Sequence, residues 1–258
     1  MKLFKVATCA WLAVLGAACV DRQDPDPELS SSVQELATTN GLSSINGLNT
    51  QNGLNTQNGL NTQNGLNTQN GLSSSGALVT TAAGRTTLSY LVRCALPAGH
   101  SIKKTVGSTT YTFTGAIGVA PGWETGQCDQ KCQEWVSACM VAHINTAGVH
   151  IPLWVVADPS YQPQIGWALS PSYPNQEGSF FGNIFKSPPT MYYCNGRDFD
   201  VNTVPGRIGY DTSQRPYVNP WGYNAPCDGH CAASDYPYPN SGYKACYGYN
   251  AVFTVWRQ

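Results

Sequence analysis

Cysteine and histidine at helical spacing give this chain of 258 residues its clearest chemical pattern. Cys128, Cys132, Cys139 and His143 fall on one stripe of a helix at 100° per residue. Thiolates and imidazoles are zinc ligands, but the stripe would be about 22 Å long, so one ion could not contact all four side chains. The pattern therefore predicts a helix over residues of about 128–146 that is held by disulfides, with no metal and no cofactor.

The first 18 residues predict export. Lys2 and Lys5 precede a short apolar stretch and several small residues, which is typical of a secretory signal and too short for a membrane span. Leu15-Gly16-Ala17-Ala18-Cys19 resembles the lipoprotein box, in which the cysteine is lipidated. We expect Cys19 to anchor the protein to a membrane of the cell envelope, at the outer membrane or the cell surface. Ordinary signal cleavage, which would release the protein, is the alternative.

Eight cysteines remain after the signal and the lipidation site are set aside. An even number in an exported chain predicts four disulfides, and eight cysteines allow 105 connectivities. One arrangement would join the two Cys-x-x-x-Cys segments, at 128–132 and 227–231, to each other. The disulfide candidates are Cys94, Cys128, Cys132, Cys139, Cys194, Cys227, Cys231 and Cys246.

Aromatic side chains crowd the second half of the chain among Asn, Gly and Pro. Exposed rings beside amide side chains are what sugar binding uses, because flat rings cover C–H surfaces and amides bond hydroxyls. The alternative is that the rings fill the core of a loop-rich domain. The residues that we expect to contact a polysaccharide are Trp167, Trp221, Tyr223, Tyr236 and Tyr238.

Other reactive patterns predict no catalytic residue. A cysteine at a helix start could be an activated thiolate, but eight cysteines pair without leaving a thiol. The aspartates and Asn202 of residues 198–202 have calcium-loop spacing, without the glycine and glutamate that such loops need. No spacing brings together two carboxylates for glycoside hydrolysis; the candidates for such a pair are Glu124, Glu134, Asp158 and Glu177.

The folded domain is expected at residues 76–258. Alternation predicts strands over 86–92 and 251–256, and a short apolar run rich in β-branched residues predicts a buried strand over 149–156. A hairpin of 102–106 with 109–113 is expected around Gly107-Ser108. Beyond Asp158, Pro and Gly interrupt the chain every few residues. The predicted class is α+β: a small antiparallel sheet, one main cysteine-bearing helix, and a loop-rich second half that disulfides hold.

An acidic spacer and a repeat occupy residues 19–75. Asn-Gly-Leu recurs every six residues from residue 40 to residue 70, and no charged residue lies between Glu35 and Arg85. One leucine in six residues cannot offset the entropy of ordering the backbone, so the repeat predicts a polar tether. The alternative is a repeat that self-associates as a small β-solenoid in a structural surface protein.

The chain resembles an uncharacterised family of exported myxobacterial proteins with Asn-Gly-Leu hexads. The hexads after the lipoprotein-like signal and three segments, 94–99, 132–153 and 177–185, carry the resemblance. It implies export, surface attachment and one domain, and it assigns no catalytic residue.

Charge excludes one class of partner. Fourteen basic and 15 acidic residues give a net charge of −1, which provides no attraction for nucleic acid. The sequence thus favours a lipid-anchored envelope protein that binds polysaccharide over an enzyme. A secreted hydrolase of cell-wall or matrix material and a structural surface protein are the alternatives.

Overall fold

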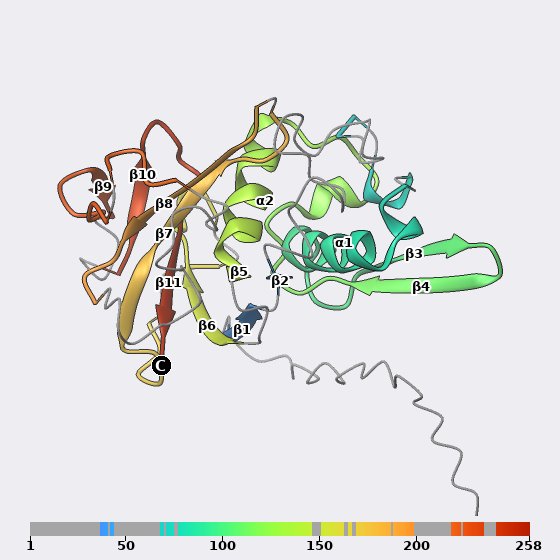
Figure 1. The fold of residues 1–258 in the computed structure, drawn as a ribbon, viewed down its shortest axis with the longest axis horizontal. Helices are drawn as coiled ribbons and strands as arrows, with labels where there is room; N and C mark the ends of the chain where they lie inside the picture. The colour runs from blue at the N-terminus through green and yellow to red at the C-terminus, as the bar shows by residue number, and fades with distance from the viewer. Residues whose placement is uncertain are drawn as a thin grey trace, which may run out of the picture. The chain divides into compact units, whose positions relative to one another are not determined.

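A five-stranded sheet forms the centre of the fold, in the order β1-β6-β11-β7-β8, with every neighbouring pair antiparallel (Figure 1). The strands are β1 (Ala37–Asn40), β6 (Ile151–Val156), β11 (Phe253–Arg257), β7 (Asn175–Asn183) and β8 (Thr190–Asn195). The computed structural model describes residues 37–40, 42–43, 68–69, 71–74, 77–145, 151–162, 165–166, 169–186, 188–198, 218–222, 224–234 and 241–258. All of these residues lie in one compact unit, Gln34–Gln258.

The end of the chain supplies the middle strand. β11 lies between β6 and β7, where Thr254 pairs with Val156 on one side and with Ser179 on the other. The hydroxyl oxygens of Ser179 and Thr254 are 2.8 Å apart in the buried interior. The strands predicted over 149–156 and 251–256 are therefore confirmed.

The two faces of the sheet pack against different partners. Successive residues of a strand point to opposite faces, and Phe180 and Phe181 of β7 accordingly belong to different hydrophobic clusters. Helix α2 (Gln130–Ala142) packs on the Phe180 face. The Phe181 face carries the hairpin of β9 (Cys231–Ala233) and β10 (Tyr243–Cys246). Figure 1 shows α2 and this hairpin on opposite sides of the sheet.

The predicted cysteine helix is α2, and it is more deeply buried than one apolar stripe implies. Every residue from Trp135 to Ala142 is buried. Ser137, which the helical pattern places on the solvent side, is fully buried because its hydroxyl donates to the Gln133 carbonyl and accepts from the Ile184 N–H at 2.9 Å. The hydroxyl satisfies a backbone group of the segment that follows β7, so burial costs little.

The strand predicted over 86–92 is wrong, because these residues belong to helix α1 (Ala82–Ala95). The Thr81 hydroxyl caps the helix by accepting from the Gly84 N–H at 3.0 Å. Four of the side chains that α1 buries have helical spacing: Leu88, Leu91, Val92 and Ala95. Leu88, Tyr90 and Val92 also fit a two-residue alternation, and the cap and the packing against α2 decide for the helix.

The predicted hairpin is confirmed as β3 (Ser101–Val106) and β4 (Thr109–Thr114). The two strands pair in register from Ser101–Thr114 to Val106–Thr109. Gly107 takes a φ of +60° in the two-residue turn, a conformation that glycine adopts without steric cost. The hairpin packs against α1, far from β9 and β10 (Figure 1).

Part of the predicted tether belongs to the domain. β1 extends the sheet beside β6, and β2 (Leu42–Ser43) pairs in parallel with β5 (Ile144–Asn145). Leu72, in the 3₁₀ helix η2 (Leu72–Ser74), is fully buried. The domain thus includes residues before the predicted boundary at residue 76. Polar residues can join it because backbone pairing at a sheet edge needs no apolar side chain. Residues 44–67 of the repeat lie outside those that the structure describes.

Four disulfides pair all eight predicted cysteines. They are Cys94–Cys139, Cys128–Cys132, Cys194–Cys227 and Cys231–Cys246. The first joins α1 to α2 and the second closes the start of α2, so the arrangement that links 128–132 to 227–231 is wrong. The other two lie on the Phe181 face of the sheet. The α+β, disulfide-rich class is confirmed, with a second helix of similar length beside the expected one.

Two 3₁₀ helices complete the described elements: η3 (Ala77–Thr80) leads into α1, and η4 (Pro121–Glu124) precedes α2. None of the helices in the described ranges is both long and apolar enough to cross a membrane.

The cap of α2 leads to a first prediction. The Asp129 carboxylate accepts from the Cys132 N–H at 2.8 Å, so Asp129→Ala is expected to lower the free energy of unfolding by about 1 kcal/mol. Urea denaturation of the oxidised protein measures the change. Asp129→Asn keeps the acceptor and is expected to lose only a few tenths of this. Equal losses in the two variants would show that the cap contributes nothing.

Candidate functional site

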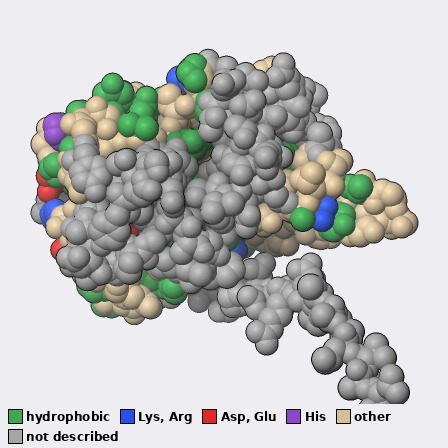
Figure 2. All heavy atoms as spheres, in the orientation of Figure 1, with side chains coloured by type: hydrophobic (Ala, Val, Ile, Leu, Met, Phe, Trp, Pro, Cys, Tyr) green, Lys and Arg blue, Asp and Glu red, His purple; other side chains and the backbone are tan. Residues whose placement is uncertain are grey.

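An aromatic cluster covers the face of the sheet opposite α2. Its rings come from β7, β8 and the two segments that follow β8 and β10, and they are Phe181, Tyr192, Trp221, His230, Tyr247 and Tyr249. Phe181 is fully buried and forms the base, since it contacts Tyr192, Trp221 and Tyr249 at centroid distances of 5.7–6.0 Å. Figure 2 shows hydrophobic side chains gathered over the β9–β10 region, with a histidine at the edge of the molecule.

Trp221 is the centre of the exposed part of the cluster. The His230 ring stacks on it at 4.8 Å with an interplanar angle of 17°, and the Tyr247 ring meets it edge-on at 5.5 Å and 88°. Tyr247 in turn packs edge-on against Tyr192 at 5.4 Å. Tyr247 is 53% exposed, His230 is exposed and Trp221 is half-buried. Rings in mutual contact thus remain open to solvent at this surface.

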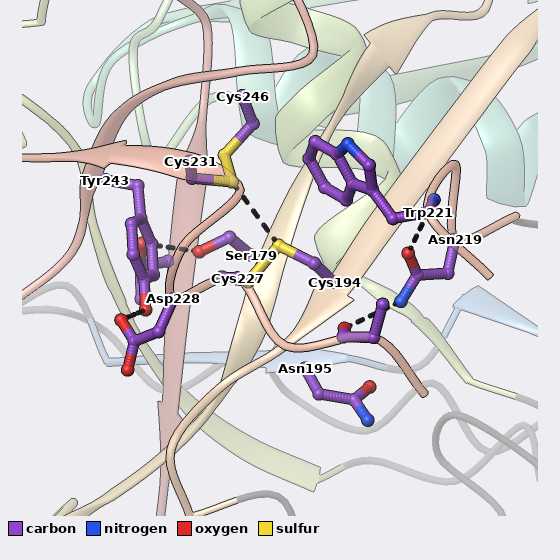
Figure 3. Close-up of a disulfide and its surroundings, with 12 residues drawn as sticks. Ser179, Cys194, Asn195, Asn219, Trp221, Cys227, Asp228, Cys231, Tyr243 and Cys246 are labelled. Atoms are coloured by element: carbon purple, nitrogen blue, oxygen red, sulfur yellow. Dashed lines mark hydrogen bonds between the residues drawn. A yellow bond between two sulfur atoms is a disulfide. The ribbon is translucent and has the colours of Figure 1, made fainter. Parts of the chain in front are cut away.

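Two disulfides fix the segments that carry these rings. His230 precedes Cys231, Tyr247 follows Cys246, and Tyr192 lies two residues before Cys194 on the same strand. The bridges Cys194–Cys227 and Cys231–Cys246 join β8 to the loop after Trp221 and β9 to β10. Figure 3 shows Trp221 beside the two bridges. Each ring is therefore held close to a covalent cross-link.

Backbone and amide contacts fix the Trp221 loop. The residue at its start, Val218, donates its N–H to the Met191 carbonyl and accepts from the Tyr193 N–H, so the loop continues the edge of β8. The Asn219 amide spans the loop, accepting from the Trp221 N–H at 3.2 Å and donating to the Ala225 carbonyl at 2.8 Å. The indole is thus positioned before any ligand arrives.

Two tyrosine hydroxyls at the cluster, those of Tyr192 and Tyr243, have a raised pKa. Burial raises the pKa of Tyr192, and the neighbouring Tyr249 and Tyr247 raise it further. Burial also raises the pKa of Tyr243, together with the hydrogen bond that its hydroxyl donates to the Asp228 carboxylate at 2.5 Å. The cluster therefore offers the protonated Tyr192 hydroxyl as an uncharged donor.

Tyr243 gives the protein a pH-dependent stability. A tyrosine in the unfolded chain loses its proton near pH 10, whereas folded Tyr243 keeps it, so stability falls as the pH rises above 10. We expect the wild type to lose about 1 kcal/mol more unfolding free energy than Tyr243→Phe between pH 8 and pH 11. Urea denaturation at the two pH values measures this. Equal losses in the two proteins would contradict the assignment.

Of the residues predicted to contact polysaccharide, the structure places Trp221 in the cluster. Trp167, Tyr223, Tyr236 and Tyr238 lie outside the described residues, as does Cys19. The sequence-based choice omitted Tyr192, Tyr247 and Tyr249, which the structure gathers into one cluster with Trp221 over Phe181. A signal was present: each of these tyrosines lies within three residues of a cysteine.

The cysteine helix holds no free thiol among its own cysteines. Cys128 is bonded to Cys132, so no thiolate stands at the start of α2. His143 is fully buried beside the Cys94–Cys139 bridge, with its Nδ1 atom 2.7 Å from the Cys139 carbonyl and 3.8 Å from the Cys139 sulfur. These three side chains could converge on an ion only if the bridge were reduced.

The acidic side chains considered for hydrolysis have separate structural contacts. Glu124 pairs with His100 at 2.7 Å, and Glu134 accepts from the Gln130 amide at 2.8 Å. Buried Asp158 accepts from the Ser160 N–H and the Ser234 hydroxyl. Glu177 is fully buried on β7. Asp198, from the calcium-like spacing, accepts from the Gln176 N–H at 2.8 Å.

A pocket of about 350 Å³ lies beside the first turns of α2. Its lining is Gln130, Lys131, Glu134, Trp135, Tyr161, Asn250 and Ala251. This lining holds one carboxylate, Glu134, whereas glycoside hydrolysis ordinarily uses two. The pocket therefore lacks the pair that such a reaction requires.

Comparisons with protein-family models, with curated proteins and with solved structures find no match to this chain.

Proposed function

We propose that this protein binds extracellular polysaccharide through the aromatic cluster. One observation carries the proposal: Trp221 and Tyr247 are partly exposed rings in edge-on contact, and disulfides fix the segments on both sides of them. The exposed His230 ring stacked on Trp221 and the Tyr247 ring at right angles to the indole offer flat surfaces to the C–H faces of sugar rings.

Rigidity lowers the cost of binding an uncharged ligand at this surface. Binding costs free energy when side chains and loops must be ordered, and the bridges and the Asn219 contacts have ordered this loop beforehand. The protonated Tyr192 hydroxyl adds a donor without charge. We therefore expect binding to depend weakly on salt, because charge contributes little to it.

The proposal includes attachment to the cell envelope. Cys19 would carry the lipid, and the segment between it and the domain would act as a tether. Because β1 starts at Ala37, the 17 residues from Val20 to Leu36 form this segment, and as a loose coil they would hold the domain roughly 20 Å from the membrane. This distance would let the aromatic cluster reach polysaccharide beyond the membrane surface. The ligand would then be polysaccharide of the same cell envelope.

A pull-down with insoluble polysaccharides tests the function. The mature chain is incubated with purified cell wall, chitin, cellulose and the matrix polysaccharide of the producing cells, and the bound fraction is measured. Trp221→Ala and Tyr247→Ala are each expected to weaken binding about tenfold, or roughly 1.4 kcal/mol. Tyr111→Ala is the matched control, because Tyr111 is half-buried on the β3–β4 hairpin.

Three results would contradict the proposal: no binding to any of the polymers, full binding by both cluster variants, or an equal loss in the Tyr111 control. The same incubation tests the two alternatives. Release of soluble sugar would indicate a hydrolase. Sedimentation of the protein without polymer would indicate a structural protein that self-associates.

A further inference from the structure

The two disulfides beside the aromatic cluster touch each other. The Sγ atoms of Cys194 and Cys231, which belong to different bridges, are 3.6 Å apart. The Cys246 sulfur lies within 4.8 Å of both. Figure 3 marks this contact between the bridges with a dashed line. Thiol–disulfide exchange requires one sulfur to approach another directly, and the fold already holds the Cys194 and Cys231 sulfurs in contact.

Access from solvent differs among the four cysteines. Cys231 is half-buried, whereas Cys194, Cys227 and Cys246 are each at most 1% exposed. An external thiolate can therefore reach the Cys231 sulfur more easily than the other three, and of these two bridges Cys231–Cys246 is the first to be attacked.

We infer that these cysteines form a thiol–disulfide exchange site whose substrate is an external dithiol, either a small molecule or the paired cysteines of a redox protein. One thiolate of the dithiol attacks Cys231 Sγ, and Cys246 leaves as a thiolate. The second thiol of the dithiol displaces Cys231, so the dithiol is oxidised to a disulfide and the bridge is reduced by two electrons. The protein then holds free Cys231 and Cys246 beside an intact Cys194–Cys227 bridge.

The second step moves the remaining bridge. The Cys231 thiolate attacks Cys194 Sγ, a Cys194–Cys231 bond forms, and Cys227 leaves as a thiolate that takes up a proton. No further electrons are needed. The backbone favours this exchange, because the Cys231 N–H donates to the Cys227 carbonyl at 2.8 Å and both cysteines therefore lie on one turn. The old partner of Cys194, Cys227, and its new partner, Cys231, thus lie on the same turn.

Exchange would release part of the aromatic cluster. Once Cys246 is free, the turn that carries Tyr247 loses its covalent link to β9, while β8 stays linked to the turn that carries His230. This consequence rests on the proposed sugar binding; the exchange itself does not. We expect polysaccharide binding to fall about tenfold in the reduced, exchanged protein, as it does when Tyr247 is replaced.

The variant Cys246→Ser tests the exchange without a reductant. It leaves Cys231 unpaired beside the Cys194–Cys227 bridge, so alkylation of the folded protein followed by peptide mapping is expected to find label on both Cys227 and Cys231. Cys132→Ser is the matched control from the other Cys-x-x-x-Cys segment, and it is expected to label only Cys128, whose sulfur contacts no second bridge among the described residues. Label on Cys231 alone in Cys246→Ser would overturn the inference.

Partial reduction of the wild type keeps the test independent of that variant's folding. The full chain is treated with limiting dithiothreitol, quenched with acid, alkylated and digested. A peptide pair linked through Cys194 and Cys231 is expected, with label on Cys227 and Cys246. Label on Cys231 and Cys246 with Cys194–Cys227 intact would overturn the inference, as would earlier opening of Cys94–Cys139. Thiol mapping needs no polysaccharide, so its outcome is separate from that of the pull-down.

Discussion

Replacing both Cys94 and Cys139 with alanine is expected to lower the free energy of unfolding by about 4 kcal/mol. The bridge closes a loop with a sequence separation of 45 residues, and a longer loop removes more entropy from the unfolded chain. It also joins α1 to α2, and both cysteines are fully buried. Urea denaturation of the purified double variant, compared with the oxidised wild type, measures the loss.

The bridge at the start of α2 is the natural control. Cys128–Cys132 has a sequence separation of four residues, so its removal by two alanine substitutions is expected to cost only about 2 kcal/mol. The order of the two losses is the critical result. A loss for the short loop that equals or exceeds the loss for the long one would show that loop entropy does not set the stability of this domain.

Trp135→Ala is expected to lower the free energy of unfolding by about 3–5 kcal/mol. Trp135 is 2% exposed, and its ring meets Phe253 edge-on at 5.7 Å and 77°. Because Phe253 is on the central strand β11, the indole fixes α2 to the middle of the sheet. Alanine would leave a cavity at this junction. Calorimetry is expected to show a lower melting temperature together with the smaller unfolding free energy.

Trp135→Phe provides the comparison, since a phenyl ring fills most of the same space. We expect it to lose less than half as much free energy as the alanine variant. Both variants, assayed below their melting temperatures, are expected to bind polysaccharide as the wild type does, because α2 lies on the other face of the sheet. If the alanine variant were as stable as the phenylalanine variant, the packing role of the indole would be refuted.

Local sequence signals predicted correctly those elements whose residue pattern fits only one type of secondary structure. The turn at Gly107-Ser108 between two alternating runs gave a hairpin, and the β-branched run that ends at Val156 gave a buried strand. Residues 86–92 were ambiguous because their apolar positions suit both periods. The Thr81 cap and the contact with α2 favour the helix. The contact with α2 is a tertiary interaction, which local sequence patterns do not reveal. Pairing of polar β1 with β6 also depends on tertiary contact.

For the candidate site, the sequence predicted the types of feature, disulfides and aromatic rings, but not which residues come together. The presence of bridges followed from the number of cysteines, but their partners follow from strand register: Cys231 lies opposite Cys246 because β9 and β10 pair there. Trp221 was expected to be a binding residue. Its neighbours Tyr192 and Tyr247 were not, because they come together only when β8 and the turn after β10 meet over Phe181.

The position of the first bridge also determines how the protein would respond to mechanical force. None of the four disulfide loops includes a residue before Cys94, and β1 lies at the edge of the sheet. A pull from the N-terminal side would therefore load the hydrogen bonds between β1 and β6 first. The chain from β1 to Cys94 could then extend by roughly 190 Å before a covalent loop bears the load. In single-molecule pulling, we expect this long first extension in oxidised protein. Under the proposed attachment and polysaccharide binding, the segment would extend under load before any disulfide-closed part of the domain does.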